Sequence, residues 1–268
     1  MPYQLLLLDI DGTLRPRSVP RTPPENARAV QAVQRAGVKV ALATGRGYGS
    51  VPRGLLRGIR PDFWLCAAGA QLLDAQGTTL AANRMTPEEM YALVDFFENY
   101  ELALRFSFTD GSYAYLGYET FAARQCAAGL DVALHDGEDQ DHHLVEMPFG
   151  AYGYLSAADV ERFQAQYGYL GLRFLQESEG AYDILRPGVD KAAGLETLLA
   201  HTGLAAADCV AIGDGANDAA MLRAAGLGIA VADGAEAART AADRVGPAAD
   251  PDGVAQILAE LWPQAFAP

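Results

Sequence analysis

Two kinds of hydrophobic pattern divide the chain, and the first occupies residues 1–83 and 184–268. There, short uninterrupted apolar runs, typical of parallel strands buried on both faces, alternate with helix-like amphipathic stretches. We expect strands at 3–9, 38–46, 63–68, 209–214 and 226–233, a hairpin at 71–80, and helices at 22–37, 48–58, 190–202, 216–225, 234–242 and 252–261. In the first helix, Thr22 is the expected N-cap, Pro23 the first helical residue and Gly37 the stop. This order predicts an α/β fold with a Rossmann-like, doubly wound parallel sheet.

The second kind of pattern occupies residues 84–183 and is rich in aromatic side chains. Hydrophobic and polar residues alternate in strand fashion at 101–108, 112–118, 150–156 and 172–176. Helical segments accompany them, and the first is capped by Thr86. Ten of the 12 Tyr and eight of the 10 Phe lie between residues 84 and 182. We predict a second, α+β domain inserted into the first. The alternative is one large sheet with aromatic edge strands.

An acidic stretch at 135–143 carries three of the four histidines of the chain, His135, His142 and His143. These side chains could bind a metal, but their spacing matches no zinc pattern. We therefore interpret the stretch as a solvated loop.

Composition narrows the classes of partner. Lys and Arg number 20 against 34 Asp and Glu, a net charge of -14, which disfavours nucleic acid and anionic membranes as partners. No segment is apolar enough to span a membrane, and the N-terminal apolar run lacks a basic region and ends at Asp9, unlike a signal peptide. The odd set of Cys66, Cys126 and Cys209 fits reduced thiols in the cytoplasm. Because the net charge is negative, any anionic substrate must be bound by local groups: a metal ion, a few cationic side chains or backbone N–H groups.

Carboxylates follow two of the predicted strands. Asp9 and Asp11 end the first strand in the run DIDGT. Side chains alternate in direction along an extended segment, so these two carboxylates would point different ways, which suits two different roles. Asp214 and Asp218 follow a later strand in the run GDGAND. Ligands bind at the carboxyl ends of strands in such sheets, and magnesium takes carboxylate oxygens. The alternatives are a turn with Asx caps and an ordinary strand-to-helix loop.

Two further residues fit a phosphate site at the same edge. Thr44 ends a strand, and its hydroxyl with the backbone N–H groups of Gly45 and Arg46 suits a phosphate oxygen. Lys191 begins a helix and is one of only two lysines in the chain, beside 18 arginines. A capping threonine and a solvated lysine are the alternatives.

Together these residues predict magnesium-dependent phosphoryl transfer. One carboxylate would attack phosphorus, the other would exchange protons, and a metal and a lysine would neutralise the phosphoryl charge. The order of the runs DIDGTL, ATGR, GVDK and GDGAND resembles the phosphatases of the haloacid dehalogenase superfamily, subclass IIB, the Cof-type hydrolases. The resemblance covers the whole chain and implies that residues 84–183 form a cap over a catalytic core of 1–83 and 184–268.

The resemblance also implies a role for each residue. Asp9 would be the nucleophile and Asp11 the general acid and base. Substrate would be bound by Thr44, Gly45, Arg46, Lys191 and Asn217, and Mg²⁺ by Asp9, Asp11 (through its carbonyl) and Asp214, with Asp218 in support. Many relatives have Asn where this chain has Ala68, so any contact of that Asn with substrate is missing here.

The function implied is a phosphomonoesterase that acts on a small phosphorylated metabolite: a sugar phosphate, a nucleotide or a cofactor-type phosphate. A phosphomutase of the same subclass is one alternative, and a non-enzymatic receiver-like switch is another. We expect a monomer or small homo-oligomer in the cytoplasm. The glycine-rich run GRGYGS at 45–50 lacks the third glycine of a dinucleotide fingerprint, which argues against a nucleotide cofactor.

Overall fold

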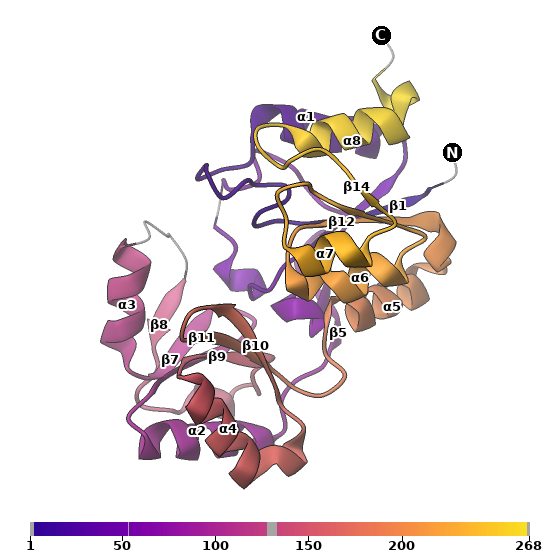
Figure 1. The fold of residues 1–268 in the computed structure, drawn as a ribbon. Coiled ribbons are helices and arrows are strands. Elements are labelled where there is room, and N and C mark those ends of the chain that lie inside the picture. Colours follow the sequence, from indigo (N-terminus) through magenta and orange to yellow (C-terminus); the bar gives the residue numbers. More distant parts are fainter. Residues whose placement is uncertain (1–2, 53, 128–132, 267–268) are drawn as a thin grey trace. The chain divides into compact units, whose positions relative to one another are not determined.

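The computed structural model describes residues 3–52, 54–127 and 133–266. Its chain folds as two compact units (Figure 1). The first unit comprises Met1–Gly45, Arg53–Ala81 and Asp190–Pro268, and the second comprises Arg46–Pro52 and Ala82–Val189. Each unit has its own sheet, so the alternative of a single large sheet is wrong.

The sheet of the first unit has the order β14-β13-β12-β1-β2-β3-β4-β5. All of its pairings from β14 to β3 are parallel, and β4 joins antiparallel to β3. The chain runs outward from β1 through β2 to β3 and later returns to the other side of β1, so the strand order reverses between β1 and β12. Ligands bind at such a reversal in doubly wound sheets. The strands are β1 (Leu5–Asp9), β2 (Lys39–Ala43), β3 (Phe63–Cys66), β4 (Gln71–Asp74), β5 (Thr79–Ala82), β12 (Cys209–Gly213), β13 (Leu227–Ala230) and β14 (Arg244–Val245).

Helices cover both faces of this sheet (Figure 1). Helices α1 and α8 pack together on one face, and α5, α6 and α7 lie on the other. Because the strands are covered on both sides, all five residues of β1 are buried, as the uninterrupted apolar run predicts. The helices are α1 (Pro24–Arg35), α5 (Lys191–Thr202), α6 (Ala219–Ala224), α7 (Glu236–Ala241) and α8 (Gly253–Leu261).

Two local predictions in the first half of the chain are wrong. Thr22 is not the N-cap of α1; Pro23 has that place and Pro24 is the first helical residue. A proline holds the residue before it in an extended conformation, which moves the helix start by one residue. The helix expected at 48–58 is only a single 3₁₀ turn, η1 (Tyr48–Ser50), because Pro52 and left-handed glycines after it prevent continuation; residue 53 lies outside the described residues.

The second unit contains an antiparallel sheet in the order β10-β11-β9-β6-β7-β8, in which the pairing of β7 with β8 at one edge is parallel. Its strands are β6 (Ala103–Ser107), β7 (Ser112–Leu116), β8 (Leu134–Asp136), β9 (Gly150–Tyr154), β10 (Arg173–Ser178) and β11 (Ala181–Leu185), and its helices are α2 (Pro87–Asn99), α3 (Tyr118–Ala127) and α4 (Ala157–Tyr167). Strand β11 pairs with both β10 and β9. The first unit therefore resumes at Asp190 and not at residue 184.

Aromatic side chains fill the core of the second unit. One face of the sheet packs Leu104 and Phe106 against Phe96 and Phe97 of α2 and Phe163 of α4. The aromatic-rich middle thus forms a core of its own, as its composition predicts.

Among the described residues, no helix is long and apolar enough to cross a membrane.

The acidic stretch at 135–143 is not a simple solvated loop. It includes the end of β8 and the 3₁₀ turn η3 (His142–Leu144). The rings of His135 and His142 both stack on Tyr113 of β7, with centroid distances of 4.5 and 3.8 Å. Stacking on an aromatic strand residue orders these rings, a contact that sequence spacing cannot reveal.

Candidate active site

The first carboxylate of the site ends the central strand β1. Asp9 is 5% exposed, and the chain turns directly after it: Gly12 has φ +105°, and its N–H donates to the carbonyl of Arg15. A Cβ at position 12 would lie 2.2 Å from Oδ2 of Asp214. Only glycine fits here, because the turn needs positive φ and the backbone approaches a carboxylate. The run DIDGT thus brings the ends of β1 and β12 together.

Lys191, the first residue of α5, joins the two strand ends. Its Nζ donates to Oδ1 of Asp9 and to Oδ1 of Asp218, each at 2.5 Å. The lysine and Asp218 are each 1% exposed. Asp190 caps the same helix by accepting from the N–H groups of Ala192 and Ala193, so the helix start that carries Lys191 is fixed. Residues 182 positions apart therefore share a buried ion pair.

Asp214 and Asp218 are held from several directions. Oδ1 of Asp214 accepts from the hydroxyl of Thr13 at 3.0 Å, and its Oδ2 accepts from Arg17 at 3.2 Å. Oδ2 of Asp218 accepts from the backbone N–H groups of Asp214 and Gly215. These contacts fix the loop after β12 and direct Asp214 toward the end of β1.

Burial and charge set the protonation of the cluster. Burial alone would lower the pKa of Lys191, but the carboxylates of Asp218 and Asp9 outweigh it and hold that pKa above its ordinary value. Burial, together with the charges of Asp218 and Asp214, raises the pKa of Asp9 although Lys191 opposes the shift. Three carboxylates share too little positive charge, so the cluster favours a further cation.

A divalent cation fits this donor set. Asp9, Asp214 and Asp218 offer carboxylate oxygens within 4.8 Å of one another. Oδ2 of Asp9 is buried and has no hydrogen-bond partner among the described residues. A buried carboxylate oxygen without a partner is costly. Magnesium prefers one or two carboxylates in such a place, so the residues present fit the metal that the sequence implies.

Asp11 lies on the turn after β1 and pairs with a neighbouring arginine. Oδ1 of Asp11 accepts from Nη2 and Nε of Arg15 at 2.6 and 2.9 Å. Arg15 also donates to the carbonyl of Val19 at 2.9 Å, so the guanidinium is anchored on both sides. The side chain of Asp11 is 23% exposed and thus reachable from solvent, unlike that of Asp9.

Comparison with known proteins places this chain in a family. A family model described as haloacid dehalogenase-like hydrolase matches residues 6–258. The chain belongs to this family. The family identified from the four sequence runs is therefore confirmed, and a non-enzymatic receiver is excluded.

Relatives of the hydrolase match it over different lengths. A phosphoglycolate phosphatase of Methanosarcina mazei is 28% identical over 96% of both chains. One of Methanopyrus kandleri is 41% identical over 38% of this chain, but only 44% of its own length is matched. A chloroplastic endoribonuclease YBEY of Arabidopsis thaliana is 40% identical, with 14% of its length matched. The matches of higher identity therefore cover less than half of those relatives.

Solved structures of low identity share the fold. A haloalkanoate-superfamily phosphatase, BT1666 of Bacteroides thetaiotaomicron, superposes with a TM-score of 0.85 at 20% identity, over 96% of this chain and 94% of that one. The subclass IIB sugar phosphatase BT4131 superposes with a TM-score of 0.82 at 20% identity, over 96% and 98%. The doubly wound α/β core with an inserted α+β unit is thus the fold of this family.

Other expected residues of the hydrolase follow strands β2 and β12 in the chain. Thr44 directly follows β2 and is 2% exposed; its N–H donates to Leu65 and its carbonyl accepts from Ala68. Gly45 is exposed at the end of the first unit, and Arg46 belongs to the second unit. Asn217 is exposed on the turn η6 (Ala216–Asp218). The substrate-binding roles of these residues remain predictions.

The loop after β3 contains Ala68, at the position where the sequence resemblance implies an Asn. This residue is 5% exposed and has φ +54°, a left-handed conformation that Asn adopts more readily than Ala. The next residue, Gly69, packs so closely that a Cβ would lie 2.2 Å from the carbonyl of Asp190. The loop therefore supports the start of α5, which carries Lys191.

Sequence reasoning missed three residues of the site. Thr13 and Arg17 bind Asp214, and Arg15 binds Asp11. Thr13 is part of the run DIDGT and could have been noted. Nothing in the sequence distinguishes Arg15 and Arg17 from the other arginines, because their contacts depend on the turn after β1.

Proposed function

We propose that this hydrolase is a magnesium-dependent phosphomonoesterase that forms an aspartyl-phosphate on Asp9. One observation carries the proposal: the ammonium of Lys191 joins Asp9 and Asp218, while the second oxygen of Asp9 lies buried and unpartnered within the described residues, beside Asp214. A nucleophilic carboxylate needs a desolvated setting, and Lys191 together with a bound Mg²⁺ would supply the positive charge that attracts an anionic phosphoryl group.

In the first step, a carboxylate oxygen of Asp9 bonds to phosphorus while the bond to the leaving oxygen breaks. Asp11 gives its proton to that leaving oxygen. In the second step, Asp11 accepts a proton from water as the water oxygen attacks phosphorus. Inorganic phosphate leaves, and the carboxylate of Asp9 is restored. Arg15 orients Asp11 for both transfers through its two bonds to Oδ1.

The remaining residues bind the phosphoryl group and the metal. We assign Thr44, Gly45, Arg46, Lys191 and Asn217 to the phosphoryl group. A bound Mg²⁺ would be held by Asp9, Asp214 and the carbonyl of Asp11, with Asp218 in support, and would supply positive charge to the phosphoryl oxygens. Asp218 acts chiefly by holding Lys191 and the loop after β12.

The names of the relatives and the presence of the second unit support a proposal for the substrate class. Full-length relatives include enzymes named phosphoglycolate phosphatase, and a fold neighbour is named a sugar phosphatase. We propose a small phosphorylated metabolite as substrate, with the inserted unit as the specificity-determining cap. We further propose that the protein works in the cytoplasm as a monomer or small homo-oligomer, without nucleic-acid partners.

A phosphate-release screen tests the proposal. The wild type is assayed on sugar phosphates, phosphoglycolate, nucleotides and cofactor-type phosphates, with Mg²⁺ and after chelation, beside Asp9→Asn. We expect release that depends on Mg²⁺ and is abolished in Asp9→Asn. Release after chelation, or turnover by Asp9→Asn, would contradict the proposal. A product phosphorylated at a new position with little free phosphate would indicate a mutase instead.

A burst experiment separates the two carboxylates. With an activated aryl phosphate, Asp11→Asn should release about one leaving group per site and then slow by ~10²–10⁴-fold, because only the second step needs its base. The peptide that contains Asp9 should gain one phosphoryl group in mass. Steady turnover, or mass gained on another residue, would remove Asp11 from the acid–base role.

A further inference from the structure

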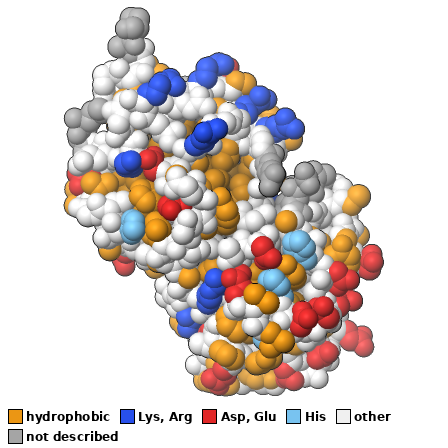
Figure 2. All heavy atoms as spheres, turned by 180° about the vertical axis from the view of Figure 1, so that it is seen from behind, with side chains coloured by type: hydrophobic (Ala, Val, Ile, Leu, Met, Phe, Trp, Pro, Cys, Tyr) orange, Lys and Arg blue, Asp and Glu red, His pale blue; other side chains and the backbone are white. Residues whose placement is uncertain are grey.

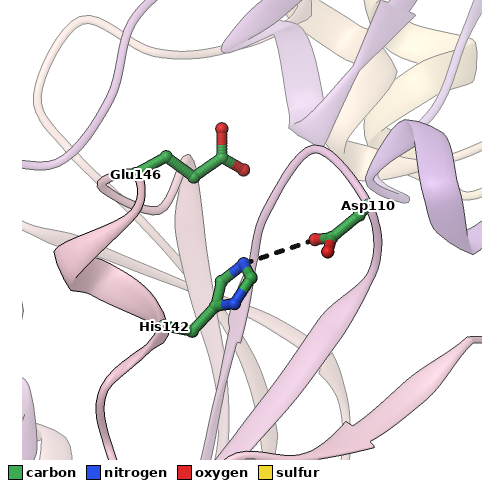
Figure 3. Close-up of side chains that lie close together, drawn as sticks. All are labelled: Asp110, His142 and Glu146. Carbon is green, nitrogen blue, oxygen red and sulfur yellow. Dashed lines mark ion pairs between the residues drawn. The ribbon is translucent and has the colours of Figure 1, made fainter.

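A second group of potential metal ligands lies in the second unit. Asp110 in the turn between β6 and β7, His142 at the start of η3, and Glu146 offer ligand atoms within 4.8 Å of one another (Figure 3). On the face drawn in Figure 2, histidine side chains lie among acidic ones in this unit. None of these residues takes part in the proposed phosphatase chemistry.

The ring of His142 is held in place by aromatic neighbours. It stacks on Tyr113 with centroids 3.8 Å apart and an interplanar angle of 17°, and it meets Phe108 edge-on at 4.5 Å. Its side chain is 18% exposed. These contacts direct Nε2 toward Asp110 (Figure 3). A ligand side chain fixed by packing loses little entropy when it binds a metal.

The separation of the first two ligand atoms suits a shared metal. Nε2 of His142 and Oδ1 of Asp110 are 3.4 Å apart. An ordinary N–H···O hydrogen bond is about 2.7–3.2 Å long, so this pair is long for a direct bond. Zinc bonds of about 2.0–2.2 Å at tetrahedral angles place two ligand atoms roughly 3.4 Å apart. The geometry therefore leaves room for an ion between them.

Both carboxylates are oriented by outer partners. Oδ2 of Asp110 accepts from the hydroxyl of Tyr113 at 2.8 Å. Oε1 of Glu146 accepts from the N–H of Thr109 at 2.6 Å, and its Oε2 accepts from the Thr109 hydroxyl and pairs with Arg84 at 2.7 Å. Metal-binding carboxylates are commonly held by such partners. The guanidinium of Arg84 also pairs with Glu146, so a metal ion at this site would share that carboxylate with Arg84.

We propose that Asp110, His142 and Glu146 bind a zinc ion in the second unit. One imidazole and two carboxylates suit zinc, with water as the fourth ligand. Glu146 would bind through Oε1 and keep Arg84 on Oε2. The ion would tie the turn between β6 and β7 to the segment 142–146. This site is independent of the proposed phosphatase function.

Calorimetric titration with Zn²⁺ in excess Mg²⁺ tests the site. The wild type is compared with His142→Gln, Asp110→Asn and the matched control His143→Gln, whose ring contacts Tyr91 and Tyr115 and no ligand of the cluster. We expect one Zn²⁺ per chain in the wild type and in His143→Gln. The affinity should fall by more than about 100-fold in the other two variants.

Failure of the wild type to bind Zn²⁺, or equal binding by wild type and His142→Gln, would overturn the proposal. Substitution with Co²⁺ in the wild type provides a second measurement if a variant does not fold. A four-coordinate histidine–carboxylate site gives intense visible absorption, and a six-coordinate oxygen site gives weak absorption. Weak absorption at one bound equivalent would also overturn the proposal.

Discussion

The two units bury different kinds of side chain. In the first unit, the aliphatic core borders a buried charged cluster, which lies where β1 and β12 end and α5 begins: Asp9, Asp214, Asp218 and Lys191. In the second unit, aromatic rings fill the core, and Glu89 is its buried charged side chain among those described. Burying charge is expensive and adds little stability by itself. The difference indicates that the first unit is built around a reactive cluster and the second around packing.

The largest effect should come from removing the cation of the cluster. Lys191→Met leaves the buried carboxylates of Asp9 and Asp218 without their ammonium. We expect activity to fall by at least ~10²–10³-fold and the free energy of unfolding without Mg²⁺ to fall by about 3–5 kcal/mol. Steady-state assays and urea denaturation in chelator measure the two effects.

The other lysine of the chain is the matched control. Lys39 forms an exposed ion pair with Asp62 at 2.9 Å, and its side chain is 57% exposed. An exposed pair contributes about 0–1 kcal/mol, so Lys39→Met should leave both activity and stability nearly unchanged. Equal behaviour of the two variants would remove the distinction between the buried cluster and ordinary surface charge.

A second test moves a carboxylate without changing any charge. Gly12→Ala would place a Cβ 2.2 Å from Oδ2 of Asp214, whereas a Cβ at Gly37 meets nothing within 4 Å. Both positions have positive φ, so each variant carries about 1–2 kcal/mol of backbone strain. Only Gly12→Ala should lose Mg²⁺ binding in calorimetry. Retained binding in that variant would show that Asp214 is free to move.

The third test addresses packing in the second unit. Phe106 is fully buried against Tyr115, with ring centroids 5.0 Å apart. Phe106→Ala should lower stability by about 3–5 kcal/mol, because it leaves a cavity in the core. Mg²⁺ binding by the first unit should persist below the unfolding transition. Leu144→Ala, at a side chain 78% exposed, is the control and should change little. Loss of Mg²⁺ binding in Phe106→Ala would mean that the units do not keep separate cores.

The smallest expected effect on stability comes from Tyr115 of the second unit, which loses its proton at an unusually high pH. Burial raises the pKa of Tyr115 to about 12. Above pH ~10 the unfolded chain loses this proton while the folded chain keeps it, so stability should fall as pH rises from about 10 to 12. Ultraviolet titration should show one late-ionising tyrosine fewer in Tyr115→Phe. An unchanged titration curve would contradict the assignment.

Much of the fold follows from local sequence signals. The run LLLLD predicts a central strand because both of its faces are apolar, and β1 is buried at every position. Thr86 predicts the start of α2, where it forms a capping box with Glu89. The short helix expected at 48–58 fails because glycine and proline outweigh amphipathic spacing. The predicted boundary between residues 183 and 184 cuts through β11, because the pairing partners of a strand leave no local signal in the sequence.

The sequence alone determined which residue types stand at the strand ends, since buried parallel strands place their last polar residues at one edge of the sheet. It therefore predicted Asp9, Asp214, Asp218 and Lys191 as one group. Only the tertiary structure decided how they meet: Lys191 between Asp9 and Asp218, Arg17 on Asp214, and Arg15 on Asp11. It likewise decided that His142 lies on Tyr113 beside Asp110. Such contacts join residues far apart in the chain and depend on side-chain directions, which periodicity does not encode.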